Sequence, residues 1–180
     1  MVHKKPLFLA LGLIGALAGP VHPETSGTRS NSSDPRARLE GTWLVRAKFV
    51  EVGGVPITDG ALFKVLFTFM PGRTDDEGTL IDTNEFQFTP NPICTPDQGV
   101  WRRVGRRDFI ATQLNFCFDQ DHNGNPAGPT KIWGTVKLSR DGQEMEIRQL
   151  IKGFDTGGTL VFEGKVLGHG RRVQAEAPPQ

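Results

Sequence analysis

The chain has 180 residues, of which 37% are hydrophobic, and it carries a formal net charge of +1 at pH 7. A nearly neutral chain has no general attraction to nucleic acid or to anionic membranes, so neither is an expected partner. The sequence has no Gly-rich phosphate loop and no redox-cofactor motif, which argues against nucleotide-dependent and redox enzymes.

Residues 1–18 are typical of a cleavable signal peptide. Lys4 and Lys5 precede an apolar segment that is too short to cross a bilayer comfortably and that ends in Ala-Leu-Ala, a small-x-small cleavage pattern. We therefore expect a secreted or periplasmic protein with no stable membrane anchor, and an uncleaved anchor is the alternative. Removal of the two lysines would change the net charge from +1 to −1.

The rest of the chain divides into a domain with a flexible segment on each side. Residues 19–38 are rich in Pro, Ser, Thr and Gly and poor in apolar side chains, so we expect a flexible linker. Residues 39–173 form a single domain that is large enough for its own core. Residues 174–180 have the composition of a disordered tail.

The domain reads as about eight short strands separated by turns, with no convincing helix. Each strand can pair with the next through a short connection. This pattern predicts an all-β fold, a single eight-stranded antiparallel up-and-down barrel, and a β-sandwich with the same strand count is the alternative. The expected strands are 43–52, 61–70, 79–88, 98–104, 108–118, 131–139, 143–152 and 159–167.

Two turns predict strand registers. Asp141-Gly142 is a hairpin signal that places Leu138 opposite Met145 and Lys137 opposite Glu146, with apolar pairs on one face and an ion pair on the other. A one-residue slip would destroy both patterns. Gly105-Arg106 reads as a two-residue turn that places Trp101 opposite Ile110 and Arg103 opposite Asp108.

The register from Gly105-Arg106 places Cys94 opposite Cys117. Directly opposed residues of antiparallel strands are close enough for a disulfide, and an exported protein is exposed to an oxidising environment. We therefore expect a Cys94–Cys117 bond, and two separate buried thiols are the alternative. Pro96 cannot donate to the ladder, so it is the position where a bulge is expected.

The start of the first strand, Gly41-Thr42-Trp43, resembles the lipocalin/calycin superfamily when taken with the strand run, the leader and the late arginines Arg171 and Arg172. In that family the Trp closes one end of the barrel and packs against a late Arg. The resemblance implies that Trp43 is a barrel plug, with Arg171 or Arg172 over it. The Gly99-Val100-Trp101 pattern, with Phe109 and Phe118-Asp119, also resembles small exported bacterial barrels related to allene oxide cyclase and lipocalin-like cyclases.

The inward-facing positions predict a ligand site in the lumen. Gln149 lies opposite Gly134, and a buried amide that faces a missing side chain indicates a water-filled gap or a ligand contact. An apolar cavity with a few polar groups is the usual form of a small-molecule site. The alternative is a barrel filled by side chains, with its polar groups at the mouth. The candidate ligand-binding residues are Gln149, Met145, Asn84 and Glu85.

The segment that begins at Asp119 matches the first half of a calcium loop. Asp119, Asp121 and Asn123 supply oxygen ligands at alternate positions, and Gly124 follows at the sixth position. The twelfth position is Thr130, where a calcium loop has Glu, and the same residues suit a long hairpin loop for backbone reasons. Calcium is the one cofactor that the sequence suggests.

Three functional hypotheses follow. The protein is an exported carrier of a small hydrophobic molecule, or a cyclase or isomerase on the same barrel, or a structural barrel without a ligand. In an enzyme, Glu85 or Asp82 would be the acid or base, since burial raises the pKa of a carboxyl. A lumen without room contradicts the first two hypotheses, a buried carboxyl favours the enzyme, and a lumen with amides alone favours the carrier.

Overall fold

The structure, a computed structural model, describes residues 37–88, 93–119 and 125–176. The predicted signal peptide and almost all of the predicted linker lie outside these residues. The described strands are β1 (Gly41–Val52), β2 (Val55–Pro56), β3 (Phe63–Pro71), β4 (Glu77–Asn84), β5 (Ile93–Cys94), β6 (Asp97–Arg103), β7 (Asp108–Asp119), β8 (Asn125–Leu138), β9 (Glu144–Phe154) and β10 (Leu160–Arg172), with one 3-10 helix, η1 (Glu85–Phe88).

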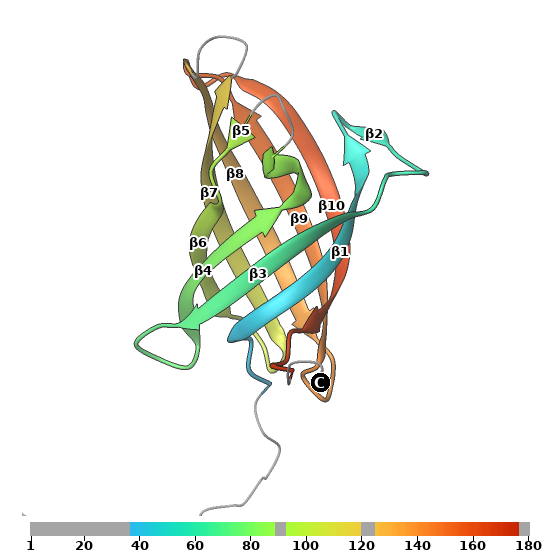
Figure 1. The fold of residues 1–180 in the computed structure, drawn as a ribbon, viewed down its shortest axis with the longest axis vertical. Helices are drawn as coiled ribbons and strands as arrows, with labels where there is room; N and C mark the ends of the chain where they lie inside the picture. The colour runs from blue at the N-terminus through green and yellow to red at the C-terminus, as the bar shows by residue number, and fades with distance from the viewer. Residues whose placement is uncertain (1–36, 89–92, 120–124, 177–180) are drawn as a thin grey trace, which may run out of the picture. The chain divides into compact units, whose positions relative to one another are not determined.

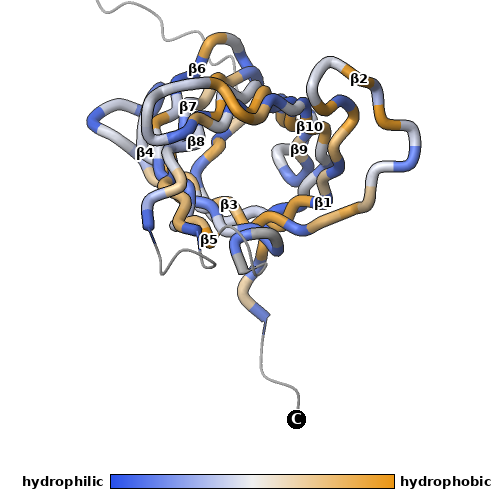
Figure 2. The backbone as a smooth tube through the Cα atoms, turned by 90° about the horizontal axis from the view of Figure 1, so that it is seen from above, coloured by the Kyte–Doolittle hydropathy of each residue, from blue (hydrophilic) through white to orange (hydrophobic). Residues whose placement is uncertain are grey.

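The strands close into an antiparallel barrel. The sheet order is β10-β9-β8-β7-β6-β4-β3-β1-β2, and an additional pairing of β10 with β1 closes the ring. The short β2 folds back on the end of β1 and the short β5 pairs with β7, so the eight longer strands form the barrel wall (Figures 1 and 2). The predicted up-and-down barrel is confirmed, and the sandwich alternative is wrong because the first and last strands are hydrogen-bonded to each other. The described residues contain no helix that is long and apolar enough to cross a membrane.

The β8–β9 hairpin has the predicted register. Leu138 pairs with Met145 and Lys137 with Glu146. The backbone N–H of Ser139 donates to the carbonyl of Glu144 at 2.9 Å, which closes the turn. Near the turn, side chains alternate between a buried and a more exposed face in both strands, so the hydrophobic pattern and the turn residues specify the same pairing.

The predicted β6–β7 register is wrong by one residue. Trp101 pairs with Ala111 rather than with Ile110. The connection is longer than a two-residue turn, because the N–H groups of Val104 and Gly105 both donate to the carbonyl of Asp108. The extra length shifts every pair of this hairpin by one position.

The predicted disulfide is present even so. Cys94 on β5 pairs with Cys117 on β7, and their sulfur atoms are bonded. The pairing of β7 changes by one residue between β5 and β6, across Thr95 and Pro96. A bulge at Pro96 thus compensates for the longer turn at the other end of the hairpin.

One predicted strand is too long. Residues 79–88 were expected to form a single strand, but β4 ends at Asn84 and the chain turns into η1. The backbone N–H of Asn84 donates to the Gln87 side-chain oxygen at 3.2 Å, which closes the turn locally. Leu80, Asp82 and Asn84 therefore share the inward face of β4, which ends before Glu85.

One end of the barrel is plugged by side chains. Trp43 is fully buried, and its indole N–H donates to the Leu39 carbonyl at 2.9 Å. Trp101 and Phe109 pack edge to face at 5.8 Å and are also buried. Arg103 lies over the Phe109 ring at 4.5 Å and donates to the Ala37 carbonyl at 2.9 Å. The N-terminal segment of the domain is thereby held across this end.

The other end of the barrel is accessible to solvent. Along β1 the inward side chains Trp43 and Ala47 are fully buried, whereas Phe49 is half-buried. Along β9 the inward Ile147 is buried, whereas Gln149 and Ile151 are half-buried. Exposure thus rises along the inward face from the plugged end to the mouth, as expected of a lumen that is open at one end.

Candidate functional site

A pair of buried carboxyl groups lies between the plugged end and the mouth. Asp82 on β4 and Asp97 on β6 are directly opposed in the sheet, and both face inward. Asp82 is 2% exposed and Asp97 is 1% exposed. Directly opposed residues of an antiparallel pair bring their side chains into contact, so the barrel topology places these two carboxyls side by side.

Three amide side chains continue the polar group across the lumen. The Gln113 amide N–H donates to Asp82, and the Asn115 amide N–H donates to Asp97 Oδ1 at 2.6 Å. Gln149 on β9 then donates to Gln113 Oε1 at 3.3 Å. These five residues, Asp82, Asp97, Gln113, Asn115 and Gln149, are called the lumen floor below.

Burial disfavours the ionised form of both carboxyl groups. Desolvation raises the pKa of Asp82 well above its usual value, and the neighbouring Asp97 raises it further. Desolvation also raises the pKa of Asp97, although hydrogen bonds from Asp82 and Asn115 oppose that rise. The pair is therefore set up to share a proton, with Asp82 as the group that keeps it. In the part of the chain that the structure describes, no Lys, Arg or His forms an ion pair with either carboxyl.

Aromatic side chains form the wall on the mouth side. Phe49 stacks on Phe63 with ring centroids 5.7 Å apart and meets Phe162 edge to face at 6.0 Å. These three rings come from β1, β3 and β10, which are adjacent in the closed sheet. The site therefore combines an apolar wall with a compact polar floor.

The wall has space at Gly134. A Cβ atom built on Gly134 would lie 3.5 Å from the nearest atom, Gln149 Cγ, which is an ordinary van der Waals distance. The equivalent atom on Gly168, deeper in the barrel, would lie 2.8 Å from Val45. A methyl group thus fits beside Gln149 at Gly134, whereas at Gly168, nearer the plug, it would clash.

The other predicted site residues are distributed unevenly. Gln149 belongs to the lumen floor and Asn84 lies just above it on the inward face of β4. Met145 is inward but 2% exposed, in the filled half of the barrel. Glu85 lies on η1 with an exposed side chain, and its carboxylate pairs with Lys64 at 3.5 Å. The structure thus links Asp82 and Gln149 through Gln113, places Asn84 on the same face of β4 as Asp82, and leaves Glu85 and Met145 apart from them.

The structure distinguishes between the two arginines suggested for the plug. Arg172 lies over Trp43, with its Cζ atom 4.3 Å from the ring centroid. Arg171 points outward and pairs with Glu144 at 3.3 Å, so it is not a plug residue. Adjacent residues of a strand face opposite sides, which is why only one of them can cover the indole ring.

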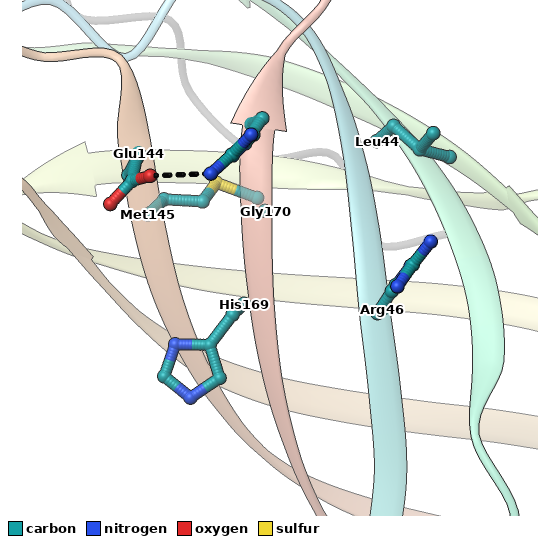
Figure 3. Close-up of a pocket in the computed structure, with 7 residues that line it drawn as sticks. Leu44, Arg46, Glu144, Met145, His169 and Gly170 are labelled. Atoms are coloured by element: carbon teal, nitrogen blue, oxygen red, sulfur yellow. Dashed lines mark ion pairs between the residues drawn. The ribbon is translucent and has the colours of Figure 1, made fainter.

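Arg171 instead borders a groove on the outer wall. The groove has a volume of about 540 Å³ and also contains Arg46 and His169, which are directly opposed on β1 and β10. Figure 3 shows this groove, with a dashed ion pair from Glu144 beside it. It lies on the side of the sheet away from the lumen floor.

Two of the candidate calcium ligands, Asp121 and Asn123, lie outside the described residues. Asp119 is the last residue of β7. Within residues 37–88, 93–119 and 125–176, no group of three or more His, Cys, Asp or Glu side chains is placed to hold a metal ion. Calcium binding by this loop stays a prediction.

Three residues of the floor were not predicted, namely Asp97, Gln113 and Asn115. A signal for two of them was present in the sequence. Cys117 faces inward to form the disulfide, and the two-residue period of a strand then turns Asn115 and Gln113 inward as well. Asp97 carried no such signal, because its orientation depends on the bulge beside Pro96.

No protein-family model and no curated protein matches the chain. Among solved structures it is similar to the S-type phycobiliprotein lyase CPES from Guillardia theta, with 8% sequence identity and a TM-score of 0.37. That match covers 77% of this chain and 90% of the lyase chain. The barrel fold is established by the strand pairing itself, and the function is argued below from the residues of the lumen.

Proposed function

We propose that the protein binds a small, mainly apolar molecule in the open half of its lumen. The observation that supports this most directly is the lumen floor, a buried group of carboxyl and amide side chains beneath an aromatic wall that solvent reaches from the mouth. Sites for small molecules combine an apolar lining with a few convergent polar groups that orient the ligand.

The chemistry of the floor suggests which polar group the ligand carries. Two carboxyls lie within a set of amides, and no cation pairs with them among the described residues. A carboxylate or phosphate ligand would meet a buried group of the same sign, which is unfavourable at low dielectric. A hydroxyl, amide or amine can donate to the floor, so a ligand with such a donor group is the best match.

Native mass spectrometry of the purified protein tests this proposal. We expect a co-purified molecule whose bound fraction falls when Gly134 is replaced by Val, because the added side chain occupies the space beside Gln149. Thr135→Val is the matched control, since Thr135 is the next residue of β8 and is exposed on the outer face. The proposal is wrong if no apolar molecule binds, either on purification or from a library of amphiphiles, or if both variants reduce binding equally.

A specific observation favours a second candidate, that the bound molecule is rearranged in the lumen. Asp82 holds a proton next to the ionisable Asp97, and its pKa is raised by burial. Such a pair can donate a proton at one atom of a substrate and accept one at another, which is the proton balance of an isomerisation or cyclisation. No co-reactant is consumed in that step.

Asp82→Asn separates the two candidates. Asn keeps the shape and one acceptor oxygen of Asp but cannot donate a carboxyl proton. If the protein is an isomerase, the variant still binds the molecule and returns it unchanged, whereas the wild type converts it. If wild type and variant both return the molecule unchanged, the protein is a carrier.

We also propose that the protein acts outside the cytoplasm. The Cys94–Cys117 disulfide supports this location, because such bonds persist in secreted and periplasmic proteins and are rare in the reducing cytosol. The intact mass of the exported protein tests it. A mass that begins at Gly19 is expected, and a full-length chain retained in the membrane contradicts it.

A further inference from the structure

The lumen floor carries a negative charge that no cation of the described residues balances. A carboxyl pair that shares one proton keeps one negative charge, so Asp82 and Asp97 together hold a single charge in the interior. Arg103 on β6 and Arg172 on β10 lie over aromatic rings of the plug, and neither forms an ion pair with the floor. Buried charges in proteins are normally paired, so the floor lacks one positive charge.

Within the described ranges, the floor also holds a hydrogen-bond acceptor without a donor. Asn115 is 7% exposed, and its amide N–H donates to Asp97 Oδ1 at 2.6 Å. An ionised carboxylate can only accept, so the amide nitrogen faces Asp97 and the amide oxygen is turned toward Cys117 Sγ, at 3.6 Å. That sulfur is bonded to Cys94 and carries no hydrogen to donate. A buried acceptor without a donor is costly, and a ligand that donates to it removes the cost.

The charge and the unpartnered oxygen lie side by side, on the part of the floor nearer the mouth. Along β7, Asn115 is two residues farther from the plug residue Phe109 than Gln113 is, and both amides face inward. Asp82, which is hydrogen-bonded to Gln113, keeps the shared proton, so the ionised carboxylate is the one that Asn115 contacts. A ligand group that enters from the mouth therefore meets a carboxylate and an amide oxygen together.

We propose that the molecule bound in the lumen is an amphiphilic amine with one positive charge, whose ammonium group lies between Asp97 and Asn115; this names the ligand class of the site proposed above and rests on that function. An ammonium group has three donors and no acceptor, so it suits a site made of acceptors, and its charge balances the floor. A hydroxyl brings no charge and adds an acceptor of its own. The aromatic wall of Phe49, Phe63 and Phe162 then packs against the apolar part of the amine.

Three ligands with the same alkyl chain test the ligand class on the wild-type protein, by isothermal titration calorimetry at neutral pH. Decylamine should bind about 10-fold tighter than decanol or more, because charge-assisted hydrogen bonds are about twice as strong as neutral ones. Decyltrimethylammonium has the charge but no N–H donor, so it should bind about 10-fold more weakly than decylamine. If none of the three binds, the proposed function fails as well. If decanol or decyltrimethylammonium binds as tightly as decylamine, only the assignment to an amine is overturned.

Asp97→Asn tests whether the lumen floor makes this distinction. The substitution removes the charge and keeps the shape, so the variant should bind decanol as the wild type does and lose the preference for decylamine. Glu146→Gln is the matched control, because it removes one negative charge from the outer face, where Glu146 pairs with Arg148, and it should keep the preference. A preference that survives Asp97→Asn, or that both variants lose equally, overturns the proposal. The comparison of ligands on the wild type stays decisive if Asp97→Asn folds poorly.

Discussion

The guanidinium of Arg172 lies 4.3 Å from the ring centroid of Trp43 and closes one end of the barrel. It donates to the carbonyls of Glu40 and of Arg38, the latter at 2.6 Å. Gly41 permits this approach, because it has φ 117° and a Cβ atom there would lie 2.7 Å from Arg172 Nη1. The Gly-x-Trp pattern thus has a physical reason, since the glycine leaves space for the arginine that covers the tryptophan.

Replacing Arg172 tests the importance of this closure. Arg172→Ala should lower the free energy of unfolding by about 2 to 3 kcal/mol, because charge-assisted hydrogen bonds and a stacked ring contact are lost together. Arg171→Ala is the control and should change it by less than about 0.5 kcal/mol, as its ion pair with Glu144 is exposed. Urea unfolding measures both values. Equal losses would contradict the assignment of the plug to Arg172.

The lumen floor should give the protein a distinctive dependence on pH. The pKa of Asp82 is raised by burial in the folded state, so the folded protein holds this proton more tightly than the unfolded chain does. The contribution of this proton to the free energy of unfolding is fully present below the pKa that Asp82 has in the unfolded chain. It is lost as pH rises through the pKa that Asp82 has in the folded protein. Asp82→Asn should therefore become more stable relative to wild type as pH rises above the ordinary carboxyl pKa of about 4.

Asp141→Asn is a control of opposite sign. Hydrogen bonds from Ser139 and from the backbone of Gln143 lower the pKa of Asp141, so its contribution is present at neutral pH and is lost as pH falls. In unfolding curves across the pH range, the stability difference between Asp82→Asn and wild type should grow with pH. The difference between Asp141→Asn and wild type should shrink in acid. Identical pH profiles for the two variants would show that Asp82 is not buried as described.

The disulfide should contribute measurably to stability. Cys94 and Cys117 are 23 residues apart in the sequence, and closing a loop of that size removes about 3 kcal/mol of entropy from the unfolded chain. The double variant Cys94→Ala, Cys117→Ala should lose about this amount in urea unfolding and keep the β-sheet circular dichroism spectrum. A much smaller loss would mean that the unfolded chain already holds these segments together.

The barrel and one of its hairpins could be predicted because several signals agreed. In β8 and β9 the alternation of apolar residues and the turn at Asp141-Gly142 require the same pairing. In β6 and β7 the turn was the main signal, and the extra loop residues shifted Trp101 by one position. Loop length is decided by backbone hydrogen bonds that composition does not reveal.

The lumen floor was only partly predictable for a related reason. Gln149 and Asp82 lie on strands whose alternation is clear in the sequence, and both were candidates. Glu85 was a candidate because the sequence of residues 79–88 does not decide which face of the strand turns inward, and the face with Asp82 is the one that does. The 3-10 turn after Asn84, with its hydrogen bond to Gln87, was not predicted either. A buried polar group assembled from four strands can be read from the sequence only when every register is known.

Two glycines provide a direct test of which half of the barrel has room. A Cβ atom on Gly134 makes only ordinary contacts, so Gly134→Ala should leave the free energy of unfolding unchanged or raise it by about 0.5 kcal/mol. A Cβ atom on Gly168 would lie 2.8 Å from Val45 and 3.0 Å from Ile147, so Gly168→Ala should cost about 1 to 3 kcal/mol. Both glycines face inward, and neither has a positive φ, so backbone strain does not distinguish them. If the two substitutions cost the same, the space beside Gln149 is filled and a ligand cannot bind there.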